Sequence, residues 1–408
     1  MSKRLVNRFL TYVIRQGRLG VVFADGSSRT YGTPAPGFPE IVLRVTDAAV
    51  PRDVLIDHEL GAAEAFMEGR LLIEEGDVMG LASLFRANNP WDKGGRIGKP
   101  SLLKGFWDRA TFAAEQINNS IGSKANVAHH YDIGNELYAL MLDNEHWQYS
   151  CGYWSQGVTT LSQAQEAKLA HIAKKLALSP GQEVLDIGCG WGGMAIHLAR
   201  HHDVHVTGIT LSDEQAALAR QRVQEAGVAD RVTILLEDYR DTAASARRYD
   251  RIVSVGMFEH VGRAQFETFF RCCANLLAND GVMLLHTIGR FGSPGTTDPF
   301  TRKYIFPGGY IPALSETLAA SEKSRLIATD IETLRLHYAK TIRVWYANCN
   351  AHRDAIVAMY DERFFRMWTF YLAGAATVFE HGGMGNYQIQ YVRDRNALPT
   401  TRDYLIGA

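Results

Sequence analysis

The most informative part of this sequence is the segment Val184-Leu185-Asp186-Ile187-Gly188-Cys189-Gly190-Trp191-Gly192-Gly193. Its first half closes an apolar, β-prone run, Glu183–Ile187, and its last glycines open a stretch with helical periodicity, Gly192–Arg200. Glycine permits a tight turn and lets the backbone approach a bound nucleoside closely. The order of strand, glycine loop and helix therefore predicts a nucleotide-type site at the end of a strand.

The same alternation of strands and helices continues after the glycine loop. Further β-prone runs lie at Val204–Ile209, Val232–Leu236, Arg251–Val255 and Val282–His286, and helix-period stretches lie at Asp213–Glu225 and Arg263–Leu277. Near-continuous apolar strands between helices indicate a parallel sheet covered on both faces. We therefore predict an α/β fold with a doubly wound sheet, whose ligands bind beyond the carboxyl ends of its strands.

The glycine triplet alone would also fit a dinucleotide site. Three details disfavour that alternative: Asp186 lies two residues before the first glycine, Trp191 crowds the loop, and the second strand ends in Gly208-Ile209-Thr210 without an acid at its tip. Asp213 follows Ser212 and is typical of the first turn of a helix. A nicotinamide-dependent oxidoreductase is therefore the less favoured interpretation, as is a glycine turn that holds no ligand.

Composition narrows the class of protein further. The 408 residues correspond to roughly two to three domains. Lys and Arg total 43 and Asp and Glu total 44, which argues against a nucleic-acid partner. The 5 cysteines form no CxxC pair, which indicates a reducing cytosol. No apolar run reaches the about 18 residues of a membrane span, so we expect no integral membrane protein.

The N-terminus predicts a basic amphipathic helix in residues 1–18, which contain five basic residues and no acid: Lys3, Arg4, Arg8, Arg15 and Arg18. It lacks the unbroken apolar region and the cleavage site of a signal peptide. Such a helix lies on an anionic membrane surface or packs on its own domain or on a second subunit. We favour the packed alternative because amphipathic helices usually face a core.

Three regions follow from the distribution of turn residues. Residues 1–87 read as a small α+β domain with strands at Val21–Ala24 and Ile41–Val45 and a helix at Pro51–Phe66. Clusters of Gly, Pro and Asn mark residues 88–125 as a linker around a helix at Leu102–Gln116. Residues 126–408 form the remaining, larger domain. We expect the first domain to serve lipid, membrane or dimer contacts.

The glycine loop with Asp186 resembles motif I of the S-adenosylmethionine-dependent methyltransferases, and further segments extend the resemblance to one branch of them. These segments are His129–Asp132, Asn135–Tyr138, Gln148–Trp154, Gly208–Gln215, Asp238–Asp241, Ser254–Gly262, Leu285–Gly289 and Lys303–Pro307. Together they are similar to the cyclopropane-fatty-acyl-phospholipid synthases over roughly residues 126–395. Residues 20–75 resemble, more weakly, the accessory N-terminal domain of the bacterial members. The resemblance implies a Rossmann-like class I methyltransferase sheet for the catalytic domain, residues 126–408.

The resemblance also implies the reaction. A cis double bond in an acyl chain of a membrane phospholipid attacks the methyl group of S-adenosylmethionine, a carbocation forms, and loss of a proton closes a cyclopropane ring. An alkene is a poor nucleophile and water would quench its cation, so the site must be dry, electron-rich and equipped with a base.

Two sets of residues carry over from the family. For S-adenosylmethionine, the resemblance places Tyr149, Ser150, Asp186, Gly188, Gly190 and Gly192 around the methionine portion, Thr210, Leu211 and Gln215 near the ribose, and Asp238 and Tyr239 near the adenine. For a bicarbonate ion that takes the proton, it implies Cys151, Glu259, His286, Ile288 through its backbone, and Tyr338. A carboxylate facing an anion is unfavourable, so we expect Glu259 to be protonated when the ion is bound. Taken alone, each of the four side chains would more often be structural.

The C-terminal part contains an aromatic-rich stretch, residues 364–372, which lines an acyl-chain slot or packs as an ordinary helix. Some relatives carry a cysteine on this helix, where this sequence has Ala375, which disfavours covalent catalysis by cysteine. We predict no metal site, because the adjacent pairs His129-His130 and His201-His202 have the wrong spacing for two ligands on one helix face.

Several alternatives stay open. The same cation could give a methyl-branched, methylene or oxygenated chain, and the chain could be a non-catalytic lipid-binding protein or a methyltransferase of soluble small molecules. We expect a cytoplasmic enzyme, peripheral on the inner face of the membrane, with a possible homodimer.

Overall fold

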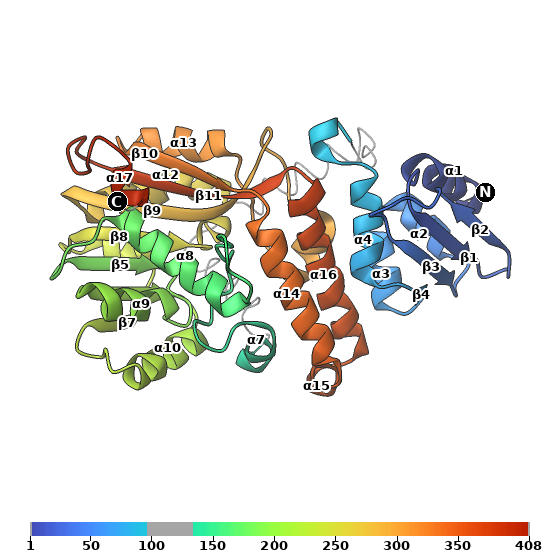
Figure 1. Cartoon of the computed structure of the whole chain (residues 1–408), viewed down its shortest axis with the longest axis horizontal. Helices are drawn as coiled ribbons and strands as arrows, with labels where there is room; N and C mark the ends of the chain where they lie inside the picture. Colours follow the sequence, from blue (N-terminus) through green and yellow to red (C-terminus); the bar gives the residue numbers. More distant parts are fainter. Residues whose placement is uncertain (1, 96–133, 407–408) are drawn as a thin grey trace. The chain divides into compact units, whose positions relative to one another are not determined.

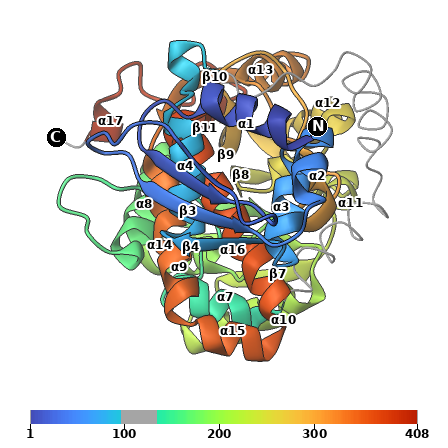
Figure 2. The ribbon, with the colours of Figure 1, turned by 90° about the vertical axis from the view of Figure 1, so that its right-hand side faces the viewer.

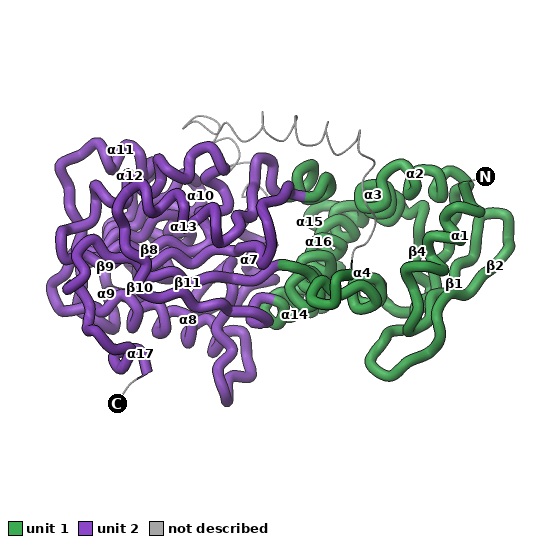
Figure 3. Tube along the Cα trace, turned by 90° about the horizontal axis from the view of Figure 1, so that it is seen from above, with its two compact units in different colours: residues 1–108, 298–305, 339–383 green, residues 109–297, 306–338, 384–408 purple. Residues whose placement is uncertain are grey.

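The computed structural model describes residues 2–95 and 134–406. The predicted helix at Leu102–Gln116 and the motif at His129–Asp132 lie outside the described residues. Contacts divide the chain into two compact units, shown in green and purple in Figure 3. Unit 1 comprises residues 1–108, 298–305 and 339–383, and unit 2 comprises residues 109–297, 306–338 and 384–408.

Unit 2 contains a seven-stranded sheet with the order β10-β11-β9-β8-β5-β6-β7. The strands are β5 (Glu183–Ile187), β6 (His205–Thr210), β7 (Val232–Leu236), β8 (Tyr249–Val255), β9 (Leu277–Arg290), β10 (Ile327–Leu334) and β11 (Met384–Val392). Strands β7, β6, β5, β8 and β9 pair in parallel, and β11 runs antiparallel to both β9 and β10. The order reverses beside β5, where the glycine loop begins, and this is the switch point at which such sheets bind ligands.

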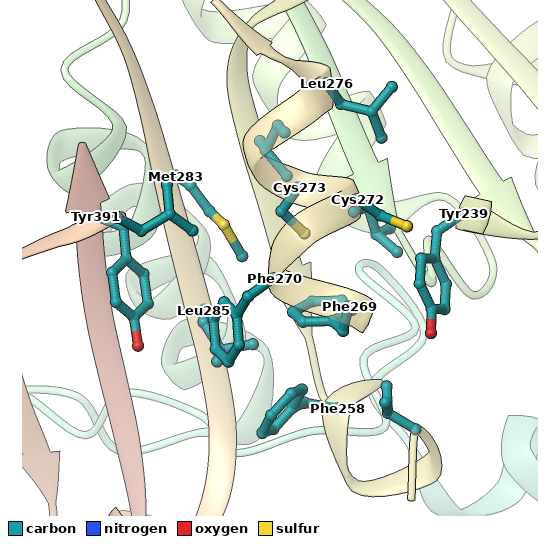
Figure 4. Close-up of a cluster of buried hydrophobic side chains, with 14 of the residues drawn as sticks. Tyr239, Phe258, Phe269, Phe270, Cys272, Cys273, Leu276, Met283, Leu285 and Tyr391 are labelled. Atoms are coloured by element: carbon teal, nitrogen blue, oxygen red, sulfur yellow. The ribbon is translucent and has the colours of Figure 1, made fainter. Parts of the chain in front are cut away.

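Helices cover both faces of this sheet (Figure 1). The helices of unit 2 are α7 (Asn135–Met141), α8 (Leu161–Leu176), α9 (Gly193–His202), α10 (Asp213–Glu225), α11 (Tyr239–Ala244), α12 (Phe266–Leu276), α13 (Leu314–Glu322) and α17 (Asp403–Ile406). Neighbouring strand residues point to opposite faces, so Ile252 joins one apolar cluster and Val253 joins the other. In the first cluster Phe270 of α12 lies on the side of Met283 of β9, and Phe269 lies toward Tyr239 (Figure 4). The predicted doubly wound α/β fold is therefore confirmed.

The predicted strands agree with β5 to β8 within two residues, whereas β9 is longer than expected and β10 and β11 were not predicted. Strand β11 buries Asn386, Gln388 and Gln390 almost completely. Strand β10 mixes polar and apolar residues and is largely exposed. Neither pattern has the apolar signature on which sequence-based assignment of strands depends.

Unit 1 contains a four-stranded sheet of order β2-β1-β3-β4. Its strands are β1 (Arg18–Val22), β2 (Ser28–Tyr31), β3 (Glu40–Val45) and β4 (Leu71–Glu75), and its helices are α1 (Ser2–Val13), α2 (Val50–Ile56), α3 (Leu60–Met67), α4 (Val78–Ala87), α14 (His337–Ala351, from residue 339), α15 (Arg353–Met359) and α16 (Glu362–His381). Helix α4 packs on β3 (Figure 2), and α16 packs on α3 and α4. The predicted helix at Pro51–Phe66 is wrong as one element: Asp57 accepts hydrogen bonds from the N–H groups of Glu59 and Leu60, which ends α2 and starts α3.

Helix α1 buries Val6, Leu10 and Val13 in the core of unit 1. The apolar stripe of the N-terminal helix is thus packed on its own domain, as favoured above. The predicted continuous domain of residues 126–408 does not coincide with unit 2, because residues 339–383 group with the N-terminal segment. The boundaries at 87 and 125 stay predictions. In the described part of the chain, no helix combines the length and apolar character needed to cross a bilayer.

Candidate active site

A pocket in unit 2 opens where β5, β6, β7 and β8 end. Its wall is formed by residues 147–150, 186–191, Met194, 209–211, Gln215, 237–240, 255–257, His260 and Val261. All the residues predicted to bind S-adenosylmethionine line this pocket except Gly192, which caps the first turn of α9. The structure therefore brings together side chains that are up to 90 positions apart (149 to 239) in the sequence.

The glycine loop packs closely against Met257, and this contact restricts which residue can stand at Gly188. Gly188 has a φ of +81°, and a Cβ atom there would lie 2.7 Å from the Cβ and Cγ atoms of Met257. The N–H groups of Gly188 and Cys189 both donate to the carbonyl oxygen of Ile209, which ties the loop to the end of β6. Only glycine fits this position without displacing the opposite wall.

Asp186 lies near the end of β5, two residues before Gly188, and forms part of the pocket wall. Its side chain is 1% exposed, and burial raises its pKa to about 7. One of its oxygens, Oδ2, has no hydrogen-bond partner among the described residues. A buried acceptor without a partner is costly, and a ligand amine or hydroxyl in the pocket would satisfy it.

Lys168 supports the same wall and was missed by the sequence analysis. It lies on α8, is fully buried, and its ammonium donates to Gln148 Oε1 (2.5 Å) and Ser150 Oγ (2.9 Å). Burial lowers its pKa to about 7, against the opposing effect of Asp143 and Asp186. The sequence does contain a signal that Lys168 is buried. It belongs to a series with the spacing of one helix face, all of whose members are buried: Leu161, Gln165, Lys168, Ile172 and Lys175.

On the other side of the pocket, polar contacts order the ends of β6 and β7. Thr210 Oγ1 donates to Gln215 Oε1 (3.0 Å), and both residues are buried. The carboxylate of Asp238 accepts from the N–H of Arg240 and pairs with its guanidinium at 2.6 Å. Asp238 thus starts α11, and Arg240 pairs with the carboxylate that is expected near the adenine.

Glu259 follows β8 and is 7% exposed. Its Oε1 atom accepts a hydrogen bond from the N–H of Ile288 (2.6 Å), whereas Oε2 is buried without a partner among the described residues. Burial raises the pKa of Glu259 to about 7. The raised pKa favours the protonated carboxyl group below neutral pH, and its protonation with a bound ion stays a prediction.

His286 lies on β9 beside the pair Asn386 and Gln388 of β11. The Asn386 amide is 3.1 Å from His286 Nε2, and the Gln388 amide is 3.2 Å from Nδ1. Burial, with a smaller effect of Lys168 and Lys175, lowers the pKa of His286 to about 3, so the ring is neutral. A neutral imidazole has one N–H and one lone pair, so one amide presents its oxygen and the other its N–H.

Cys151 and Tyr338 are also buried in unit 2. Burial raises the pKa of the Cys151 thiol, which favours the neutral form. The segment after Cys151 lies beside the start of α14, because the N–H of Trp154 donates to His337 Nδ1 (2.8 Å) and the Tyr153 ring stacks on His337. These contacts place Tyr153 and Trp154 beside the start of α14, and a separate hydrogen bond places Glu259 against Ile288.

Comparison with known proteins assigns the family. A family profile described as mycolic acid cyclopropane synthetase matches residues 119–389. This chain belongs to that family. It is 37% identical over 365 residues to a cyclopropane-fatty-acyl-phospholipid synthase of Escherichia coli strain K12, covering 88% of this chain and 90% of the relative. It is 40% identical over 287 residues to a probable fatty acid methyltransferase of Pseudomonas putida, covering 68% of this chain and 72% of that relative.

Solved structures agree with this assignment to the cyclopropane synthetase family. A cyclopropane synthase from Mycobacterium tuberculosis matches with a TM-score of 0.62 and 32% identity, covering 66% of this chain and 97% of that one. A mycolic acid cyclopropane synthase in complex with S-adenosylhomocysteine matches with a TM-score of 0.61 and 34% identity, covering 66% and 97%. The fold is therefore that of the class I methyltransferases, the chain is an S-adenosylmethionine-dependent methyltransferase, and the oxidoreductase alternative is wrong.

The pocket fits S-adenosylmethionine as co-substrate. Polar contacts along its wall come from the oxygen of Asp186 that lacks a partner among the described residues, from the close backbone of the loop at Gly188, and from the paired Thr210 and Gln215. None of the residues expected around bicarbonate lines this pocket. A protonated Glu259 has an O–H to donate, whereas both ring nitrogens of His286 already face amide groups.

Proposed function

We propose that this enzyme transfers a methylene group from S-adenosylmethionine to the cis double bond of an acyl chain in a membrane phospholipid and closes a cyclopropane ring. The observation that carries this proposal is the buried Glu259, anchored on the N–H of Ile288, whose second oxygen meets no partner within residues 2–95 and 134–406. The similarity to the Escherichia coli synthase over 88% of this chain supports the phospholipid substrate.

In this proposal, S-adenosylmethionine supplies the electrophilic methyl group, whose bond to sulfur breaks as the π-electron pair of the alkene attacks. Residues 147–150 and the glycine loop enclose the pocket, and Gly188 brings the backbone of β5 against Met257. Apolar residues of this wall exclude water, which would otherwise quench the acyl-chain cation. The cation then loses a proton from the added methyl group, and the released electron pair closes the ring.

The proton acceptor in the proposal is bicarbonate, which supplies a base of suitable strength when bound. Glu259, His286, the backbone of Ile288, Cys151 and Tyr338 would hold it. Glu259 in its protonated form donates a hydrogen bond to an oxyanion, and its other oxygen stays fixed on Ile288. The neutral thiol of Cys151 is a weak donor rather than a nucleophile at the pKa that burial imposes.

We further propose that the enzyme is cytoplasmic and docks on the inner face of the membrane. The apolar stripe of α1 is buried, so the contact would use its outward face. That face exposes Arg4, Leu5, Arg8 and Tyr12, a combination of cationic and aromatic side chains suited to anionic headgroups. Aromatic residues of α16 stack on one another, as Phe364 does on Trp368. That these residues line an acyl-chain slot stays a prediction. A homodimer stays a prediction as well.

The test is mass spectrometry of lipids after incubation with S-adenosylmethionine and vesicles of cis-monounsaturated phospholipid, with and without bicarbonate. Ring closure predicts a gain of one CH₂, no double bond left to ozonise, and no product from Glu259→Gln. A product that still ozonises, or a methyl branch, would favour a second candidate. That candidate is a fatty acid methyltransferase that forms a branched chain, for which the similarity to the Pseudomonas putida relative speaks. No mass change would overturn the acyl-phospholipid assignment.

A further inference from the structure

A cluster of metal-type ligands lies in unit 2, on residues that do not line the co-substrate pocket. Glu166 of α8 and His197 and His201 of α9 each offer one ligand atom, and these atoms lie within 4.8 Å of one another. His197 and His201 are four residues apart on one helix, so their rings share a face, with centroids 4.7 Å apart. Glu166 Oε2 is 3.5 Å from His197 Nδ1.

A second observation concerns the buried ring of His197, which turns Nδ1 toward Glu166. His197 is only 6% exposed, and its Nε2 atom has no hydrogen-bond partner in the described part of the chain. Buried polar groups in native proteins are nearly always satisfied by protein, water or an ion. Neither the fold nor the proposed reaction uses this imidazole.

We propose that Glu166, His197 and His201 bind a divalent transition-metal ion of the zinc class. Two imidazoles and one carboxylate form a ligand set typical of Zn²⁺, whereas Mg²⁺ and Ca²⁺ prefer oxygen ligands alone. Paired histidines four residues apart on a helix hold zinc in other proteins. The fourth position is open to water or to His146, whose Nε2 is 3.4 Å from the same Glu166 oxygen.

The site is accessible from solution. The Glu166 side chain is 45% exposed and His201 is exposed, while His197 closes the inner side. The prediction of no metal site from the sequence considered only the adjacent pairs His129-His130 and His201-His202. The spacing from His197 to His201 was the signal that it passed over.

A metal ion at this cluster would stabilise the wall of the co-substrate pocket. His146 precedes Trp147 and Gln148, which line the pocket. Its carbonyl oxygen lies against the start of α9, where a Cβ atom on Gly193 would be 2.2 Å away. An ion between α8, α9 and the loop at His146 would restrict the motion of that wall. This inference does not depend on the lipid substrate or on ring closure.

The test is a titration of metal-free, tag-free enzyme with Zn²⁺ by calorimetry and with Co²⁺ by visible absorption, which reports tetrahedral ligands. We expect one ion per chain and a higher midpoint of thermal unfolding in Zn²⁺. Glu166→Gln and His201→Asn change exposed side chains and should weaken binding by about 100-fold or more. His205→Asn, an exposed histidine at the start of β6, is the matched control and should bind like the wild type.

Two outcomes would overturn the proposal. One is that the wild type binds neither ion at micromolar concentration. The other is that Glu166→Gln and His201→Asn, shown by circular dichroism to be folded, bind with unchanged affinity. Because the readout is binding and unfolding rather than turnover, failure of the proposed lipid chemistry would leave this result unaffected.

Discussion

The carboxyl group of Glu259 is fixed by the backbone N–H of Ile288, 29 positions later in the sequence, through a hydrogen bond of 2.6 Å. This bond joins the segment after β8 to β9, the next strand of the sheet. It satisfies one oxygen of a buried carboxyl and leaves the other, Oε2, buried without a hydrogen-bond partner among the described residues. Anchoring and incomplete pairing together make Glu259 suited to hold a small ligand rather than to act only as a structural group.

The first prediction concerns stability and pH. Burial raises the pKa of Glu259 from 4.5 to about 7 in the folded state, so the native protein binds one more proton than the unfolded chain between these values. Stability from this group is therefore full below pH ~4.5 and is lost as pH rises through about 7. Glu259→Gln should remove that loss, which is worth up to about 3 kcal/mol.

The measurement is urea unfolding of wild type and Glu259→Gln at intervals from pH 5 to pH 8, without bicarbonate. Glu322→Gln, which changes an exposed carboxylate of α13, serves as the control and should follow the wild type. Parallel curves for wild type and Glu259→Gln across this range would contradict a raised pKa at Glu259.

The second prediction concerns the two amides beside His286. Gln388→Leu removes the partner of Nδ1, so a buried ring nitrogen is left unpaired and the ring is no longer held in one tautomer. We expect kcat to fall on the order of tenfold or more, with the Kd for S-adenosylmethionine unchanged, because Gln388 does not line the pocket. The role assigned to Gln388 is positioning.

The matched control is Gln390→Leu, which removes a buried amide two residues further along β11. Gln390 donates to the carbonyl oxygen of Lys175 and does not contact His286. Both variants lose a buried hydrogen bond, so both should lower stability by about 1–3 kcal/mol. If both also lowered kcat equally, the effect would be general to the strand and the positioning role would be wrong.

The third prediction concerns Lys168, whose ammonium holds Gln148 and Ser150. Lys168→Met keeps the length of the side chain and removes both charge-assisted hydrogen bonds. The loop at 147–150 then loses its support, and we expect the Kd for S-adenosylmethionine to rise about tenfold, as measured by calorimetry. Lys175→Met tests specificity, because Lys175 is buried on the same helix but pairs with Glu332. An equal rise in both variants would refute the assigned contact.

The elements predicted from the sequence agree best with the structure where apolar periodicity is strong. The runs at Glu183–Ile187 and Val232–Leu236 were predicted with their observed bounds. The family resemblance, supported by the carboxyl-end rule, named Asp186, Thr210 and Asp238, which line one pocket. These successes rest on local pattern, on the resemblance and on a general rule of parallel sheets.

The failures share a different physical origin. Lys168, Asn386 and Gln388 are buried polar residues, and whether such a residue is buried depends on partners that are remote in the sequence. Periodicity assigns faces, but it does not show which polar side chain meets which partner. The pairing of Gln388 with His286 arises only when β11 inserts between β9 and β10, a register that no local signal specifies.

The fourth prediction separates two effects of glycine in the loop after β5. Gly188 has a positive φ, and it also lies against Met257. Gly188→Ala should therefore strain the backbone and, separately, bring the new Cβ atom into the Met257 side chain. We expect a loss of stability of about 1–3 kcal/mol from the backbone conformation and, in addition, a loss of S-adenosylmethionine binding as the Cβ atom displaces the opposite wall. Thermal unfolding and calorimetric titration measure the two effects independently.

Gly181 provides the control for this experiment. Its φ of +78° is nearly the same as that of Gly188, but an added Cβ atom would meet nothing within 4 Å, and Gly181 does not line the pocket. Gly181→Ala should therefore reproduce the conformational loss of stability and leave the affinity for S-adenosylmethionine unchanged. Tight binding by Gly188→Ala would mean that Met257 moves aside freely, and the close contact at the glycine loop would then have no role in shaping the pocket.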